Sequence, residues 1–193
     1  YLTFFFNFQN HYYIMNEHIQ FFQPDFTKLG FSTRTVDSLI YEFNCKEGRL
    51  DFDVWLPSVE RNLQRPLVWE QHGLTNHGDR YYHHRKLIES ILSYTDIGKF
   101  VVYKLWTNVQ PYLTIKVIDG KQRFHAISDF YNNKFGVIRN GIEYKIEDMP
   151  TNIVRRISNS PIAWAEIDSQ VKELSDKELI TLFDNINFGG VPQ

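Results

Sequence analysis

Residues 117–126 read Val-Ile-Asp-Gly-Lys-Gln-Arg-Phe-His-Ala, a sequence that predicts a strand, a sharp turn and a helix in direct succession. The β-branched residues within 115–118 are typical of a short strand, and Phe124 starts an apolar pattern with helical spacing. Gly120, between the two, can adopt a backbone conformation that other residues rarely reach, and it leaves space for a ligand. We therefore expect the first free N–H groups of the helix to face an open space beside the turn.

The side chains around this turn favour an anion as the ligand. A helix N-terminus carries partial positive charge, and phosphate is a common anion at such a position. Lys121 and Arg123 add formal positive charge, and Gln122 can hydrogen-bond a phosphate oxygen or position a water molecule. Asp119 can cap the turn or hold a divalent metal ion beside the phosphates. The residues alone leave a second interpretation open, a capped turn with solvated basic side chains, and the spacing of a P-loop is absent.

Hydrophobic patterns in the rest of the chain predict one α+β domain with a small mixed sheet flanked by helices. Expected strands span residues 50–55, 100–106, 115–118 and 162–167, and helical stripes begin near residues 36, 87, 124, 153 and 179. Asn140-Gly141 predicts a hairpin, and Ser175 with Glu178 predicts a capping box ahead of the last helix. Ser32 and Thr33 are expected to cap the first helix.

Three motifs, in this order, resemble those of a known family. Residues 64–69 resemble a Gln-Arg-x-x-x-Trp element, residues 119–123 an Asp-Gly-Gln-Gln-Arg signature, and residues 183–189 a Phe-x-x-Ile-Asn-x-Gly element. The family is the N-terminal domain of GmrSD-type, modification-dependent restriction enzymes, within the ParB/sulfiredoxin-like superfamily. The resemblance covers about residues 35–192 of the sequence. Lys121 departs from the signature by adding a charge, and Asn185 stands where relatives often carry a basic residue.

The resemblance implies a ParB-like fold that binds and hydrolyses a nucleoside triphosphate, coupled to DNA sensing and to restriction or anti-restriction. By this resemblance the expected catalytic residues are Asp119, Gln122 and Arg123, with Mg²⁺ held by Asp119 as an accompanying ion. The expected nucleotide contacts are Gly120, Lys121, Arg65, Trp69 and Asn187.

A second class of function stays open, a non-hydrolysing DNA- or protein-binding regulatory module on the same fold. Relatives often continue into a His-Asn-His nuclease domain, and no part of this sequence resembles that domain. We therefore expect a separate nuclease or host protein chain as a partner, in addition to the nucleoside triphosphate and DNA. Nuclease activity by this chain alone is not expected, because the sequence offers no carboxylate cluster for two metal ions.

The basic stretch at residues 80–86 is the candidate DNA contact. Arg80, Arg85 and Lys86 can neutralise backbone phosphates, and Tyr81 and Tyr82 beside them can stack on bases. The alternative interpretation is a helix start whose basic side chains are solvated.

Four histidines within residues 72–84 (His72, His77, His83 and His84) raise the possibility of a metal site, with Asp79 as a further ligand. Imidazole is a common ligand of transition metals. The spacing, however, matches no helix-borne zinc motif such as H-E-x-x-H. We expect instead a polar loop with exposed histidines, and His72 and His77 lie within the long loop expected over residues 57–78.

The 193 residues include 21 Lys or Arg and 23 Asp or Glu, so affinity for nucleic acid must come from a local patch rather than overall charge. The single cysteine, Cys45, excludes a disulfide framework and fits a reducing cytoplasm. No apolar stretch approaches the ~18 residues of a membrane span, so we expect a soluble cytoplasmic protein without a membrane partner. The aromatic, uncharged residues 1–14 precede Met15 and are expected to be a non-native or disordered extension of the domain at 15–193.

Overall fold

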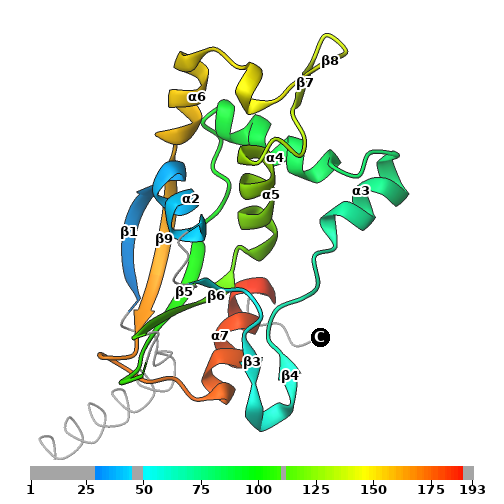
Figure 1. Ribbon diagram of the computed structural model, residues 1–193. Coiled ribbons are helices and arrows are strands. Elements are labelled where there is room, and N and C mark those ends of the chain that lie inside the picture. The colour runs from blue at the N-terminus through cyan, green and yellow to red at the C-terminus, as the bar shows by residue number, and fades with distance from the viewer. Residues whose placement is uncertain (1–28, 45–49, 110–111, 189–193) are drawn as a thin grey trace, which may run out of the picture.

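The computed structural model describes residues 29–44, 50–109 and 112–188, and it has the predicted α+β fold (Figure 1). The expectations for residues 1–14 and for Cys45 lie outside these ranges. A mixed five-stranded sheet has the order β1-β9-β5-β6-β2. Its strands are β1 (Gly30–Thr35), β9 (Pro161–Asp168), β5 (Phe100–Trp106), β6 (Leu113–Asp119) and β2 (Leu50–Asp51). Strand β9 is parallel to β5 and β2 is parallel to β6, whereas β1 with β9 and β5 with β6 are antiparallel.

Helices cover both faces of this sheet. Phe100 and Val102 of β5 belong to one core, while Val101 and Tyr103 between and after them belong to a second, as the two-residue period of a strand requires. The first core is completed by α2 (Val36–Asn44), α4 (Tyr82–Leu92), α5 (Lys121–Tyr131) and α6 (Thr151–Ser158), and the second by α7 (Asp176–Phe188). Among the described residues, no helix combines the length and the apolar character needed to cross a bilayer.

The end of β6 departs from regular alternation at a β-bulge. Val102 lies opposite Val117, but Val101 lies opposite Asp119, so Ile118 is an extra residue in the strand. Directly opposite residues share a face of the sheet. Asp119 therefore lies on the face of Val101, which α7 covers, whereas an uninterrupted strand would place it on the face of Val117.

Gly120 follows the bulge and ends the strand. Its φ of 112° and ψ of 0° form the turn that the sequence predicts, and α5 begins at the next residue. A Cβ atom on Gly120 would lie 2.3 Å from Cδ1 of Phe100, which is fully buried. The turn therefore needs glycine twice, for its backbone conformation and for the close approach of the aromatic ring.

Other elements agree with the sequence or depart from it for identifiable reasons. The hairpin of β7 (Val137–Arg139) and β8 (Ile142–Tyr144) turns at Asn140 and Gly141, both with positive φ, as predicted. The predicted strand over 50–55 is wrong in extent, because Leu50–Asp51 pairs with β6 while β3 (Trp55–Leu56) pairs separately with β4 (Arg61–Asn62). Short 3-10 helices occupy Pro57–Val59 and Ile146–Asp148.

The prediction of Ser32 and Thr33 as helix caps is wrong. Both lie in β1, which forms an edge of the sheet against β9. The capping role falls to Thr35, whose Oγ1 accepts a hydrogen bond from the Ser38 N–H at 3.2 Å. Because Ser and Thr suit exposed edge strands as well as caps, composition did not separate the two possibilities.

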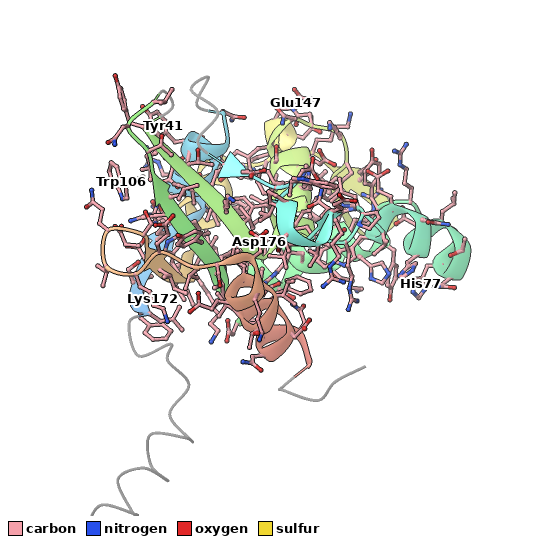
Figure 2. The ribbon with its side chains drawn as sticks, turned by 90° about the horizontal axis from the view of Figure 1, so that it is seen from below. Tyr41, His77, Trp106, Glu147, Lys172 and Asp176 are labelled. Carbon is pink, nitrogen blue, oxygen red and sulfur yellow. The ribbon has the colours of Figure 1, made fainter. Side chains whose placement is uncertain are left out.

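The long loop predicted over residues 57–78 is wrong where it contains helix α3 (Trp69–His77). Gly78, with φ of 65°, ends the helix: its N–H donates to the Leu74 carbonyl at 3.2 Å, and the N–H of Asp79 donates to the Gly73 carbonyl at 3.4 Å. Gly73 allows close packing, since a Cβ there would lie 2.5 Å from the Asp79 carbonyl oxygen. Most α3 side chains are exposed, and its tip, marked by His77, lies far from the end of β5 at Trp106 (Figure 2). An exposed helix carries no apolar stripe for the sequence to reveal.

We expect acid to weaken the fold through Glu178. Hydrogen bonds from the Ser175 backbone N–H and hydroxyl, and an ion pair with Lys172, lower the pKa of Glu178 from 4.5 to about 2. A carboxylate whose pKa is lower in the folded than in the unfolded chain stabilises the fold fully at pH values above its unfolded pKa. This contribution is lost as the pH falls from 4.5 toward 2. Glu178→Gln keeps the capping geometry without the charge, so its deficit in free energy of unfolding should shrink from about pH 5 to about pH 2.5 in urea titrations. A deficit that stays constant would contradict the prediction, and Glu173→Gln is the control for an exposed carboxylate outside the cap.

We expect Gly120→Ala to lower the free energy of unfolding by at least about 2 kcal/mol, because backbone strain and overpacking against Phe100 add. Gly141→Ala is the matched control, since Gly141 also has positive φ but its Cβ would meet nothing within 4 Å. That variant should lose about 1 kcal/mol from strain alone. Equal losses in the two variants, measured by chemical denaturation, would show that Phe100 does not constrain the turn.

Candidate functional site

A pocket of about 250 Å³ opens where β6 ends and α5 begins, the region in which α5 and α7 meet the sheet in Figure 1. It includes every residue that the sequence analysis assigned to catalysis or nucleotide binding. Its lining consists of Gln64, Arg65, Val68, Trp69, Asp119, Gly120, Lys121, Gln122, Arg123, Phe183 and Asn187. The three motifs, which are far apart in sequence, thus contribute to one pocket, while the roles of their residues stay predictions.

The N-terminus of α5 supplies backbone donors to this pocket. The Phe124 N–H donates to the Gly120 carbonyl at 2.9 Å, which makes Gly120 the residue that starts the helix. The N–H groups of Lys121, Gln122 and Arg123 come before that bond, so the helix itself offers them no acceptor. No side chain among the described residues caps this end of α5. The first turn therefore presents uncapped donors and the positive end of the helix dipole.

Arg123 is held from three sides. Its Nη2 donates to Asp119 Oδ2 at 2.6 Å, its Nη1 donates to the Ile97 carbonyl at 2.8 Å, and its guanidinium lies 4.6 Å from the centre of the Phe100 ring. Only 15% of the Arg123 side chain is exposed. These contacts fix the guanidinium and the Asp119 carboxylate against each other at the edge of the pocket.

Lys121 is held by a carboxylate that the sequence analysis did not consider. Its Nζ donates to Asp53 Oδ1 at 2.8 Å, and 10% of its side chain is exposed. The Lys121 ammonium, through this hydrogen bond and through its charge, lowers the pKa of Asp53. Asp53 is remote from the turn in sequence and follows no recognisable pattern, so only the fold reveals the pair.

Two glutamines fix the segment that carries Arg65 and Trp69. Gln64 Nε2 donates to the carbonyls of Val117 and Ile118, at 2.6 and 2.5 Å. Gln122 Nε2 donates to the Pro66 carbonyl at 2.7 Å, and its Oε1 accepts a weaker hydrogen bond from the Trp69 N–H at 3.4 Å. Gln122 thus supports the wall of the pocket, and its predicted catalytic role stays a prediction. The sequence analysis quoted Gln64 within a motif but did not predict it as a site residue. Gln64 nevertheless lines the pocket and contacts the bulge.

Helix α7 forms a further part of the pocket lining. Phe183 and Asn187 lie one turn apart and both line the pocket. Asn187 Nδ2 donates to the Phe183 carbonyl at 2.8 Å, which fixes the direction of the amide.

The predicted DNA contacts lie outside the pocket, and each is already paired. Arg80 pairs with Glu70, and Lys86 pairs with Glu89 at 3.0 Å. Arg85 pairs with Asp79 at 3.0 Å and with Glu143 at 2.5 Å, and it also donates to the Gly136 carbonyl. The Arg80 and Lys86 side chains are each 59% exposed, but that of Arg85 is only 14% exposed. Arg85 therefore also ties the β7–β8 hairpin to the connection between α3 and α4.

The expectation of exposed histidines on this segment is wrong for His84. His72 and His77 lie exposed on α3, but His84 lies on α4 and is 3% exposed. Burial lowers the pKa of His84, and it also lowers the pKa of His83. The helix turns the side chain of His84 inward because residues 84, 87, 88 and 91 share its buried face.

The pocket is small and its charged lining residues are mostly cationic. Arg65, Lys121 and Arg123 are cationic and Asp119 is the one carboxylate among its described lining residues. Its volume of about 250 Å³ is below the roughly 300–1,000 Å³ of pockets that enclose drug-sized ligands. A small anionic group suits this volume and these donors.

A family model described as GmrSD restriction endonuclease, N-terminal domain, matches residues 58–186, well over half of the chain. The match spans the segment of Arg65 and Trp69, the glycine turn and most of α7, the three parts of the pocket. No curated protein and no solved structure matches the chain. The wider relationship to the ParB/sulfiredoxin-like superfamily stays a prediction. The family predicted from the three motifs is confirmed, and the chain belongs to the N-terminal domain family of GmrSD restriction endonucleases.

Proposed function

We propose that this domain binds the phosphate chain of a nucleoside triphosphate at the start of α5 and hydrolyses it as part of a restriction-related system in the cytoplasm. The carrying observation is that one pocket combines an uncapped helix N-terminus with Arg65, Lys121 and Arg123. Backbone N–H donors and the guanidinium groups of arginine together suit phosphate oxygens. Membership of a restriction endonuclease family supports the link to DNA.

In this proposal Arg65 and the first N–H groups of α5 bind the terminal phosphates, and the Trp69 ring contacts the base at the rim. Asp119 orients the attacking water, and Arg123 positions that carboxylate through their 2.6 Å contact. The water oxygen adds to the terminal phosphorus as the bond to the bridging oxygen breaks, which yields a nucleoside diphosphate, inorganic phosphate and a proton released to solvent. A single carboxylate beside a phosphate chain is the donor set that Mg²⁺ uses in such sites, and the ion would stabilise charge on the phosphates.

A second candidate function is favoured by the same contact between Asp119 and Arg123. The carboxylate already has a strong partner, and a domain that only senses nucleotide needs no group to orient water. In that case the domain is a non-hydrolysing regulatory module, with a separate nuclease or host protein chain as its partner. For either function, we assign DNA contact to Arg80 and Lys86, the exposed members of the basic stretch. On binding, DNA phosphates would replace their present acidic partners, Glu70 and Glu89.

We expect Arg65→Ala to weaken triphosphate binding about ten- to a hundredfold, the effect of losing one hydrogen-bonded charge. Arg61→Ala is the matched control, because Arg61 is an exposed arginine on β4 that does not line the pocket. Binding is measured by titration calorimetry with each of the four ribonucleoside triphosphates and Mg²⁺. Equal affinities in the parent chain and both variants would remove Arg65 from the proposed site, and absence of binding to the parent chain would overturn the proposal.

We expect Asp119→Asn to reduce phosphate release about a hundredfold or more while triphosphate affinity changes only a few-fold. Asparagine keeps an oxygen acceptor for Arg123, so the loss reports on the charge of the carboxylate. Asp53→Asn is the control, since it removes the acidic partner of Lys121 without changing a residue that lines the pocket. A parent chain that binds triphosphate but releases no phosphate, with and without DNA, would favour the non-hydrolysing module.

A further inference from the structure

Three potential metal ligands from three helices converge outside the pocket. Glu70 of α3, His84 of α4 and Asp129 of α5 each bring a ligand atom within 4.8 Å of the others. His84 and Asp129 are 3% and 8% exposed, and Glu70 is half-buried. Ligand atoms that share an ion at about 2.0–2.2 Å lie at most about 4.4 Å apart, so shifts of a few tenths of an ångström close the cluster around one ion.

The imidazole of His84 is the nitrogen-bearing and most buried member of the cluster. Its Nδ1 is buried and has no hydrogen-bond partner within the part of the chain that the structure describes. The rings of Trp69, Tyr81 and Phe135 surround the imidazole, with centroids 5.5 to 5.8 Å away. An unsatisfied buried polar atom is costly. Burial also lowers the pKa of His84, because the charged imidazolium would lose its hydration there.

The two carboxylates are only partly neutralised by protein cations. Glu70 Oε2 pairs with Arg80, and Asp129 Oδ1 pairs with Lys134 at 2.7 Å. Both cations are mostly exposed, at 59% and 55%, so solvent screens their charge. Each pair uses one oxygen of its carboxylate and leaves the other oxygen as a possible ligand. A dication between the two acids would offset their mutual repulsion more effectively than either surface cation.

We propose that Glu70, His84 and Asp129 bind a divalent transition-metal ion such as Zn²⁺. One imidazole nitrogen and two carboxylate oxygens match the ligand types of Zn²⁺, whereas Ca²⁺ and Mg²⁺ favour oxygen ligands throughout. Three protein ligands leave a coordination position for water. The site is distinct from the pocket and does not depend on the proposed hydrolysis.

The ion would join α3 to α5 at a second point. Glu70 directly follows Trp69, whose N–H is held by Gln122 near the start of α5, and Asp129 lies two turns further along α5. A metal bond between Glu70 and Asp129 would therefore fix the wall of the pocket that carries Arg65. Its expected role is to position that wall rather than to take part in chemistry.

The test uses the full 193-residue chain, freed of metal by a chelator, with Zn²⁺ as the probe and no nucleotide present. Titration calorimetry should give a site whose affinity falls at least about tenfold in Glu70→Gln and in Asp129→Asn. Thermal unfolding should give a higher Tm with Zn²⁺ for the parent chain and a smaller increase for both variants. Glu70→Gln changes a half-buried surface residue, so the test does not depend on a variant of the buried core.

Exposed histidines are the main alternative source of Zn²⁺ affinity. The rings of His77 and His83 lie 5.6 Å apart, and Figure 2 places His77 at the tip of α3. His77→Asn should leave the affinity and the increase in Tm unchanged. Loss of binding in His77→Asn but not in Glu70→Gln and Asp129→Asn would overturn the proposal, as would a parent chain that does not bind Zn²⁺. Either result leaves the proposed nucleotide site untouched, because no nucleotide enters the experiment.

Discussion

The candidate site depends on the close contact between Gly120 and the ring of Phe100. The ring occupies the space where any other residue would place a Cβ, so strand β6 can pass directly into α5 only at a glycine. This passage directs the first turn of α5 into the pocket. The bulge at Ile118 acts together with it, because it moves Asp119 to the face covered by α7. Two local departures from a regular strand thus bring the carboxylate and the helix N-terminus to the same place.

The opposite wall is held by polar contacts as well as by packing at one end. Trp69 packs against the first core, but Leu67, at the centre of residues 64–69, is 44% exposed. Gln64 instead uses the carbonyls of Val117 and Ile118, where the bulge interrupts the ladder of β6. The same irregularity that reorients Asp119 therefore provides acceptors for the segment that carries Arg65. The stretch between Gln64 and Trp69 can therefore adjust around a ligand more easily than a segment packed into a core along its whole length.

The sequence predicted the parts of the fold that local physics determines. The helix stripes, the Asn140-Gly141 hairpin and the cap at Ser175 each depend on residues a few positions apart, and all are present. The family motifs also predicted which residues would gather in one pocket. Helix α3 was missed because its stability comes from Gln122 and from close packing at Gly73, contacts that no periodicity records. The pairing of Lys121 with Asp53, and of β1 with β9, likewise joins residues distant in sequence.

The charge balance of the pocket constrains the form of nucleotide that the proposed site takes. Asp119 and Arg123 neutralise each other at 2.6 Å in a partly buried setting, so the pair by itself attracts an anion only weakly. A phosphate chain that shares Arg123 takes part of that neutralisation from Asp119 and brings more negative charge beside the carboxylate. Arg65 and the dipole of α5 compensate on the side of the phosphates, but neither contacts the carboxylate in the proposed arrangement. A cation between Asp119 and the phosphates resolves this repulsion, and it follows that the proposed substrate is the Mg²⁺ complex of the nucleotide rather than the free anion.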